Sequence, residues 1–145
     1  MKPTACVEIL ITNQKELIFN ALISPEMISR WMFGPALREE TIIHIKNEPK
    51  TGGSFSYLVE RDGHLIDHVG VYRIIEPPQK LQFTWAIGET SPNDSLVTIT
   101  LLNDSNSCQL QLTHEMPEEW ADFVDRTQNA WARMLHQLKS LLESI

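Results

Sequence analysis

The sequence contains no motif of a covalent catalyst or of a nucleotide-binding enzyme. The patterns GxSxG, GxGxxG and GxxxxGK[ST], which mark a nucleophile elbow, a dinucleotide-binding turn and a phosphate-binding loop, are all absent. A covalent mechanism therefore has no visible candidate residue. If the protein is an enzyme, it must work by orienting a substrate and moving protons.

Cysteine and basic residues are also scarce. Cys6 and Cys108 lie far apart and form no CxxC motif, which favours small, buried or half-buried hydrophobic side chains in a reducing compartment over a redox or zinc pair. Lysine and arginine number 12 against 19 aspartate and glutamate residues, so the net charge is −7. Because phosphate binding needs clustered basic side chains, and these are scattered, we do not expect a nucleic-acid partner.

Long hydrophobic runs are missing as well. No stretch approaches the roughly 20 apolar residues of a membrane span, and no basic-flanked apolar segment precedes the first strand pattern. We therefore expect a cytoplasmic protein that does not enter a membrane. With 42% hydrophobic and 21% charged residues, the 145-residue chain has the composition of a soluble globular protein, and residues 1–145 are predicted to form one domain.

The last third of the chain carries a clear helical pattern. From Glu118 to Ile145, apolar residues recur at intervals of three and four, while polar residues such as Arg126 and Arg133 fall mostly on the other side. The apolar stripe consists of Trp120, Phe123, Val124, Ala130, Trp131, Met134, Leu135, Leu138, Leu141, Leu142 and Ile145. About 26 residues at ~1.5 Å each make a rod of roughly 40 Å, which needs a large apolar surface to lie on.

The preceding strands can supply that surface. A strand over 4–12 is followed by two short helices, for which Asn13 and Ser24 are the expected N-caps. The period then changes from 3.6 to 2, and strands are predicted over 41–45, 54–60, 64–75, 81–87, 96–102 and 109–115, with a turn over 91–94. This order of elements indicates an α+β domain.

Five segments, taken in order, carry a family resemblance. They are Ala21–Glu26 with Ile28–Trp31; Gly52–Phe55 with Asp62-Gly63 and Gly70–Tyr72; Glu76–Trp85; Leu110–His114; and Ala130-Trp131 with Leu135, Leu138 and Leu142. Together they resemble the activator-of-heat-shock-protein-ATPase homologue (AHSA-like) family of the START-like, or SRPBCC, superfamily. The resemblance extends from Thr4 to Leu142. It departs at Ser107-Cys108, where the family usually has Gly-Thr, and at Ala130, where glycine is usual and the methyl group narrows the adjacent space.

The resemblance implies a helix-grip (START-like) fold. In it, a curved antiparallel sheet of six to seven strands wraps around the long C-terminal helix, two short helices follow the first strand, and a cavity lies between sheet and helix. The family pattern also places His68 and Tyr72 inward. Function is implied less narrowly, because members of the superfamily include lipid carriers, hormone receptors, cyclases and parts of co-chaperones.

Large side chains on the converging faces are the candidate cavity lining. These side chains either form ordinary core packing or line a pocket in which tyrosine hydroxyls are polar anchors. The candidates are Trp31, Phe33, Phe55, Tyr57, His68, Tyr72, Phe83, Trp85, His114, Trp131, Met134, Leu135 and Leu138. His68 and His114 each remain open to three roles: a structural histidine, a polar ligand contact, or a general acid or base.

No metal site or cofactor is predicted. His64 and His68 are four residues apart, but on a strand this spacing spans ~13 Å, too far for both side chains to bind one ion. We assign no catalytic residue from the sequence.

Three functions remain after these exclusions. The aromatic faces favour non-covalent binding of a small hydrophobic or aromatic ligand by a monomer or homodimer. The family name suggests a second function, a chaperone-accessory or stress-response module that binds a chaperone, although the extra N-terminal domain of eukaryotic co-chaperones is not expected here. The third is a cyclase-like enzyme that transfers protons through His68, Tyr72 or His114.

Overall fold

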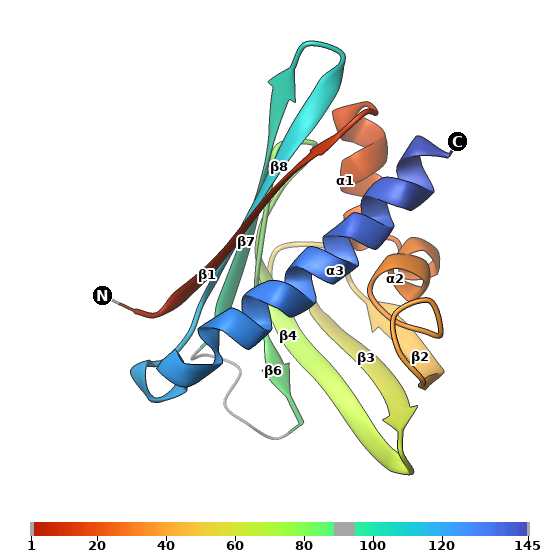
Figure 1. Ribbon diagram of the computed structural model, residues 1–145, viewed down its shortest axis with the longest axis vertical. Coiled ribbons are helices and arrows are strands. Elements are labelled where there is room, and N and C mark those ends of the chain that lie inside the picture. Colours follow the sequence, from red (N-terminus) through yellow and green to blue (C-terminus); the bar gives the residue numbers. More distant parts are fainter. Residues whose placement is uncertain (1, 89–94, 145) are drawn as a thin grey trace.

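The protein folds as a curved antiparallel sheet packed against three α-helices (Figure 1). The computed structural model describes residues 2–88 and 95–144, so the turn expected over 91–94 lies outside the described residues. The elements are β1 (Thr4–Ile11), α1 (Lys15–Ile23), α2 (Pro25–Trp31), β2 (Thr41–Asn47), β3 (Ser54–Arg61), β4 (His64–Glu76), β5 (Lys80–Thr84), β6 (Ala86–Ile87), β7 (Leu96–Asp104), β8 (Ser107–Glu115), the 3-10 helix η2 (Glu118–Phe123) and α3 (Val124–Glu143).

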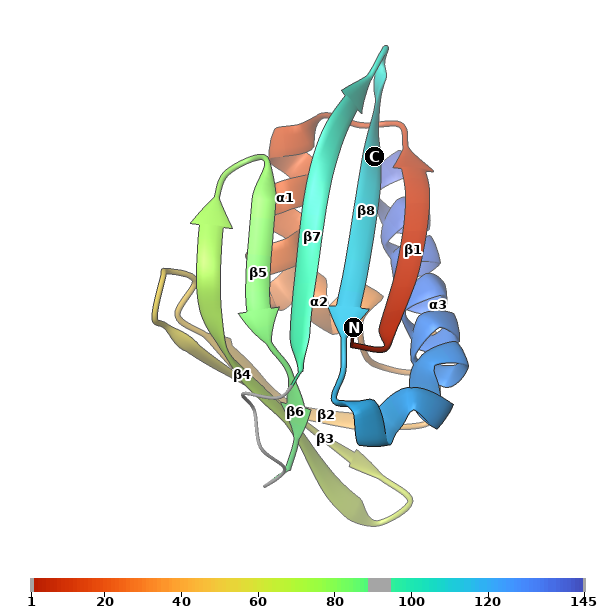
Figure 2. The ribbon, with the colours of Figure 1, turned by 90° about the vertical axis from the view of Figure 1, so that its left-hand side faces the viewer.

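The strand order confirms the helix-grip fold. The sheet runs β1-β8-β7-β5-β4-β3-β2, every pairing is antiparallel, and β6 adds to β4. All three α-helices lie on one face of the sheet, with α3 crossing it diagonally (Figures 1 and 2). The described strands number eight rather than six or seven, because the strand predicted over 81–87 is interrupted at Trp85.

The interruption at Trp85 depends on two small features of neighbouring strands. The backbone N–H of Val71 donates a 2.9 Å hydrogen bond to the Thr84 hydroxyl, so a side chain replaces the usual backbone acceptor. A Cβ atom at Gly70 would overlap the Thr84 carbonyl oxygen and would lie 2.5 Å from the Phe55 ring. Only glycine therefore lets β4 approach the chain closely at the point where β5 ends.

The edge strand β1 is covered by side chains of α3. Gln128 accepts a 2.9 Å hydrogen bond from the backbone N–H of Cys6, and Lys139 donates one of 2.6 Å to the Leu10 carbonyl. Unpaired backbone groups on a sheet edge are a template for aggregation, and these side chains occupy part of that edge. They also fix the position of α3 along the sheet.

The N-terminal part of the expected long helix differs from the prediction. Residues 118–123 form a 3-10 helix, and its apolar residues Trp120 and Phe123 are 41% and 44% exposed instead of continuing the buried stripe. Side chains three residues apart eclipse one another in a 3-10 helix. The two rings accordingly pack on each other, with centroids 5.9 Å apart, and neither belongs to the described hydrophobic core.

Two smaller expectations also needed correction. Ser24 caps α2 as expected, since its hydroxyl accepts from the backbone N–H of Met27 at 3.4 Å. Asn13 does not cap α1; its side-chain amide donates to the Leu142 carbonyl at 2.8 Å and joins the two ends of the helical layer. Both cysteines are free thiols, but only Cys108 is buried, and Cys6 is exposed.

Candidate ligand-binding cavity

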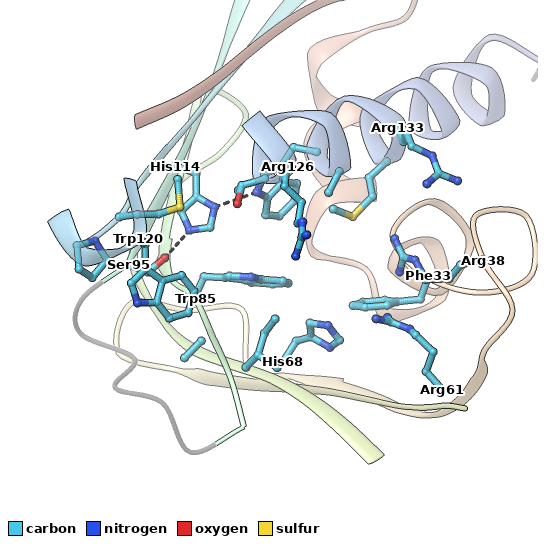
Figure 3. A pocket seen from close by; sticks show the side chains of 18 of the residues that line it. Phe33, Arg38, Arg61, His68, Trp85, Ser95, His114, Trp120, Arg126 and Arg133 are labelled. Atoms are coloured by element: carbon cyan, nitrogen blue, oxygen red, sulfur yellow. Dashed lines mark hydrogen bonds between the residues drawn. The ribbon is translucent and has the colours of Figure 1, made fainter. Parts of the chain in front are cut away.

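A cavity of about 720 Å³ lies between the N-terminal half of α3 and residues of strands β3, β4, β6 and β8 (Figure 3). Side chains from β3, β4, β6, β8, η2 and α3 line it, together with side chains from the connections after α2, after β5, before β7 and after β8. They are Phe33, Arg38, Arg61, His68, Trp85, Ala86, Ile87, Ser95, His114, Met116, Pro117, Glu119, Trp120, Arg126, Thr127, Ala130, Trp131, Arg133 and Met134. The cavity therefore draws on segments far apart in the sequence, which only the folded chain brings together.

Aromatic rings form the apolar wall of the cavity. The Trp85 ring lies 5.3 Å from that of Trp131 and 5.4 Å from that of His68, measured between centroids. Phe33 continues the wall, with its ring 4.8 Å from that of His68. Rings in such tilted contacts present large, rigid apolar surfaces, which suit a flat hydrophobic ligand.

His114 is held between α3 and the cavity by two hydrogen bonds. The indole N–H of Trp131 donates to His114 Nδ1 at 3.0 Å, and His114 Nε2 bonds to the hydroxyl of Ser95 (Figure 3). Because Nδ1 accepts, the proton of the neutral ring sits on Nε2 and is donated to Ser95. Burial lowers the pKa of His114 to about 4, so the ring is neutral at pH 7.

His68, which also lines the cavity, is the opposite tautomer to His114. Its Nδ1 lies 3.0 Å from the Tyr57 carbonyl oxygen, which can only accept, so Nδ1 carries the proton of the neutral ring. Burial lowers the pKa of His68, and the nearby Arg61 charge acts in the same direction, against the opposing effect of the carbonyl. The lone pair on Nε2 is left as an acceptor, whereas the Ser95 hydroxyl keeps a proton to donate.

A buried carboxylate organises two arginines at one side of the cavity. Glu40, whose side chain is 0% exposed, accepts from Arg61 at 2.7 Å and from Arg38 at 3.3 Å, and also from the backbone N–H of Gly34 at 2.7 Å. These bonds join the connection after α2 to the end of β3. Burial lowers the pKa of Arg38; Glu40 opposes this effect, while the charges of Arg61 and Arg133 add to it.

Two further arginines reach the cavity from α3. Arg126 projects into it from above Trp85, and its guanidinium also lies 5.7 Å from the Phe123 ring centroid (Figure 3). Arg133 donates to the Leu37 carbonyl at 2.7 Å. Neither arginine forms an ion pair with a carboxylate within residues 2–88 and 95–144.

Six of the residues proposed from the sequence come together at this cavity. They are Phe33, His68, Trp85, His114, Trp131 and Met134. The other seven pack in the hydrophobic core instead, and they are Trp31, Phe55, Tyr57, Tyr72, Phe83, Leu135 and Leu138.

The reasons for this separation lie in the partners of those core residues. The tyrosine hydroxyls, expected as anchors for a ligand, bond to each other at 3.2 Å, and Asn47 donates to that of Tyr72 at 3.0 Å. Trp31 donates its indole N–H to the Ala21 carbonyl at 2.9 Å, away from the cavity. Leu135 and Leu138 are both fully buried within the core cluster.

Four arginines and Ser95 also line the cavity, and none of them was among the candidates predicted from the sequence. Arg126 and Arg133 could have been found, because they are seven residues apart and flank Ala130, which places all three on one side of the helix. Arg38 and Ser95 lie in connections without periodicity, so no pattern in the sequence indicates where their side chains point.

Within the described residues, no group of three or more histidine, cysteine, aspartate or glutamate side chains is arranged to hold a metal ion. Among the described residues, no helix is both long enough and apolar enough to cross a membrane.

Comparison with solved structures gives the same fold. ChR145 from Cytophaga hutchinsonii is 25% identical, with a TM-score of 0.78 over 99% of this chain and 96% of that chain. NE0264 from Nitrosomonas europaea is 14% identical, with a TM-score of 0.82 over 97% and 94%. The Aha1 dimer from Colwellia psychrerythraea is 20% identical, with a TM-score of 0.75 over 97% and 96%.

Comparison of the sequence itself identifies the family. A search of curated proteins gives no match. The family model described as "Activator of Hsp90 ATPase homolog 1-like protein" matches residues 13–143, which is nearly the whole chain. The protein therefore belongs to the family of Activator of Hsp90 ATPase homolog 1-like proteins.

Proposed function

We propose that this protein binds a small hydrophobic or aromatic ligand non-covalently in the cavity between the sheet and α3. The observation that supports the proposal is a cavity of about 720 Å³ with the indoles of Trp85 and Trp131 in its wall. Ligand sites are commonly about 300–1,000 Å³, mostly apolar, with a few polar groups that fix orientation. The Ser95 hydroxyl, as donor, and His68 Nε2, as acceptor, are two such groups.

The proposal is for a carrier or sensor in the cytoplasm, and not for an enzyme. His114 has both ring nitrogens engaged, and Tyr72 lies in the core with its hydroxyl bonded to two partners. Of the three residues considered for proton transfer, only His68 presents a free nitrogen to the cavity. A single acceptor beside an aromatic wall suits binding better than acid–base chemistry, which needs a donor and an acceptor on the reacting atoms.

A neutral fluorescent probe, phenylnaphthylamine, tests the proposal. Its emission rises in apolar surroundings, so titration should show one saturable site per chain. Ala130→Phe places a ring into the cavity from α3 and should weaken binding at least tenfold. Asn129→Phe adds the same ring at the neighbouring exposed position and should leave binding unchanged. Equal binding by both variants would show that the dye sits elsewhere and would reject the proposal.

Native mass spectrometry of the freshly purified protein would identify a natural ligand. A stoichiometric adduct of small mass, absent from Ala130→Phe, is the expected result if the expression host makes the ligand. The released compound would then give its chemical class directly.

A second candidate function is chaperone binding, which the family description suggests. The specific observation that favours it is the exposed pair Trp120 and Phe123 on η2, because exposed aromatic residues are typical of interaction surfaces. If this function holds, the double substitution Trp120→Ser with Phe123→Ser should abolish binding to purified Hsp90 in surface plasmon resonance. No binding by the unaltered protein at low salt would reject this candidate.

A further inference from the structure

The charge of the cavity is opposite to the charge of the whole protein. The chain carries a net charge of −7, with 12 basic and 19 acidic residues. Yet Arg38, Arg61, Arg126 and Arg133 all line the cavity, against Glu119 as its one acidic residue in the described part of the chain. A third of all basic residues thus gather at one site of an acidic protein.

Glu40 neutralises only part of this positive charge. Its two carboxylate oxygens are already shared between Arg38 and Arg61, at 3.3 and 2.7 Å. Arg126 and Arg133 have no carboxylate partner among the described residues. Four guanidinium groups therefore face the two carboxylates of Glu40 and Glu119, and a positive excess remains.

The positions of the arginines separate a cationic side of the cavity from its aromatic wall. Arg38, Arg61 and Arg133 lie close enough to influence one another, since the charges of Arg61 and Arg133 both lower the pKa of Arg38, after the larger effect of burial. Arg126 extends into the cavity from α3, above Trp85 in the view of Figure 3. Arg126 and Arg133 line the cavity and are also exposed to solvent, so a ligand can reach both guanidiniums. A guanidinium with free N–H donors binds an oxyanion through charge-assisted hydrogen bonds.

We propose that the ligand of this cavity is an amphipathic anion, in which an apolar, ring-containing body lies against Trp85 and Trp131 and one oxyanion group binds Arg126 and Arg133. The proposal rests on the proposed function, because it names the chemical class of the ligand for that same cavity. Carboxylate, sulfonate and phosphate groups share the required chemistry. A neutral hydrophobic molecule of the same size would give the two arginines no anionic partner, and the described residues supply none.

A pair of dyes tests the charge separately from the cavity. Anilinonaphthalene sulfonate and phenylnaphthylamine share one aromatic skeleton and differ by the sulfonate group. We expect the sulfonate dye to bind about tenfold more tightly than the neutral dye, as a charge-assisted hydrogen bond allows. Raising the salt concentration should weaken binding of the sulfonate dye only.

Matched variants assign the effect to the two arginines. We expect the single variant Arg126→Gln to weaken binding of the sulfonate dye by about threefold, and the double variant Arg126→Gln with Arg133→Gln by about tenfold. Binding of the neutral dye should stay the same in both variants. Arg73→Gln removes the same charge from an exposed position of β4 that does not line the cavity, so it should not change the binding of either dye. Among the described residues, Arg126 forms no ion pair, and its cation–π contact is with the exposed Phe123 ring, so the single variant should remain folded.

Two other outcomes would overturn the inference in distinguishable ways. If both dyes bind equally and the arginine variants change neither, the cavity binds neutral ligands; the anion inference fails and the proposed function stands. If Ala130→Phe leaves both dyes bound, or neither dye binds, the proposed function fails and the inference fails with it.

Discussion

The indole N–H of Trp131 on α3 donates a 3.0 Å hydrogen bond to Nδ1 of His114 on β8. Since an indole can only donate, this bond fixes the proton of neutral His114 on Nε2, next to the Ser95 hydroxyl. In a serine nucleophile the imidazole accepts the hydroxyl proton, and here the direction is reversed. Ser95 is therefore a donor to the cavity and is not activated for attack, consistent with a binding site.

The first prediction concerns the effect of His114 on stability at low pH. Burial lowers its pKa in the folded protein to about 4, from 6.5. Between these values the unfolded chain binds a proton that the folded protein does not, so stability is complete above pH 6.5 and falls as the pH drops toward 4. The full loss is about 3 kcal/mol.

Urea unfolding of the unaltered protein and of His114→Gln at several pH values between 4 and 7 would measure this loss. Glutamine can still accept from Trp131 and donate to Ser95 but does not titrate. All other side chains are the same in both proteins, so the difference between the two curves isolates the contribution of His114. Parallel curves would show that His114 has an ordinary pKa.

A second prediction concerns Glu40: its replacement should lower the stability of the protein but strengthen binding of an anionic ligand. Glu40→Gln keeps the shape of the side chain but removes the charge that pairs with Arg38 and Arg61. Because the carboxylate is buried and the arginines are partly exposed, we expect a loss of about 2 kcal/mol in the free energy of unfolding. The sulfonate dye should bind more tightly, since both guanidiniums lose their counter-charge.

The exposed neighbour Glu39 supplies the control for this experiment. Glu39→Gln makes the same change in net charge and should alter the free energy of unfolding by less than about 0.5 kcal/mol. Chemical denaturation and dye titration measure the two effects independently. A folded Glu40→Gln protein that binds the sulfonate dye less tightly would show that Arg38 and Arg61 do not face the ligand.

The fold could be predicted from the sequence because periodicity reports which side of an element is buried. The stripe through Trp131, Leu135 and Leu138 faces the core as expected, and the serine before Pro25 caps its helix. The same reasoning failed at Trp120 and Phe123, where the helix changes to three residues per turn and the 3.6-residue period no longer applies.

The candidate site was less predictable, because alternation places a residue inward without saying what it meets there. Tyr72 and His68 lie on the same face of β4, yet only His68 lines the cavity. The hydroxyl of Tyr72 is taken by Tyr57 and Asn47, residues 15 and 25 positions away. Such partners depend on how the strands pair and curve, which local patterns do not contain.

The last prediction compares the same substitution, glycine to alanine, at two positions where it destabilises the protein for different physical reasons. Gly63 has φ +78° in the hairpin between β3 and β4, and nothing lies within 4 Å of an added Cβ atom. Gly63→Ala should therefore cost about 1 kcal/mol, the strain of a left-handed backbone. At Gly70 an added Cβ overlaps the backbone of Thr84 and the Phe55 ring, so we expect Gly70→Ala to cost about 3 kcal/mol.

The two variants should also differ at the cavity. Thr84 precedes Trp85, so displacing its backbone moves an indole of the cavity wall, and Gly70→Ala should weaken binding of phenylnaphthylamine in the folded fraction. Gly63→Ala lies outside the cavity and should bind the dye normally. Denaturation combined with dye titration measures both effects. If Gly70→Ala is as stable as Gly63→Ala and binds equally well, the close approach of β4 to Thr84 does not position Trp85.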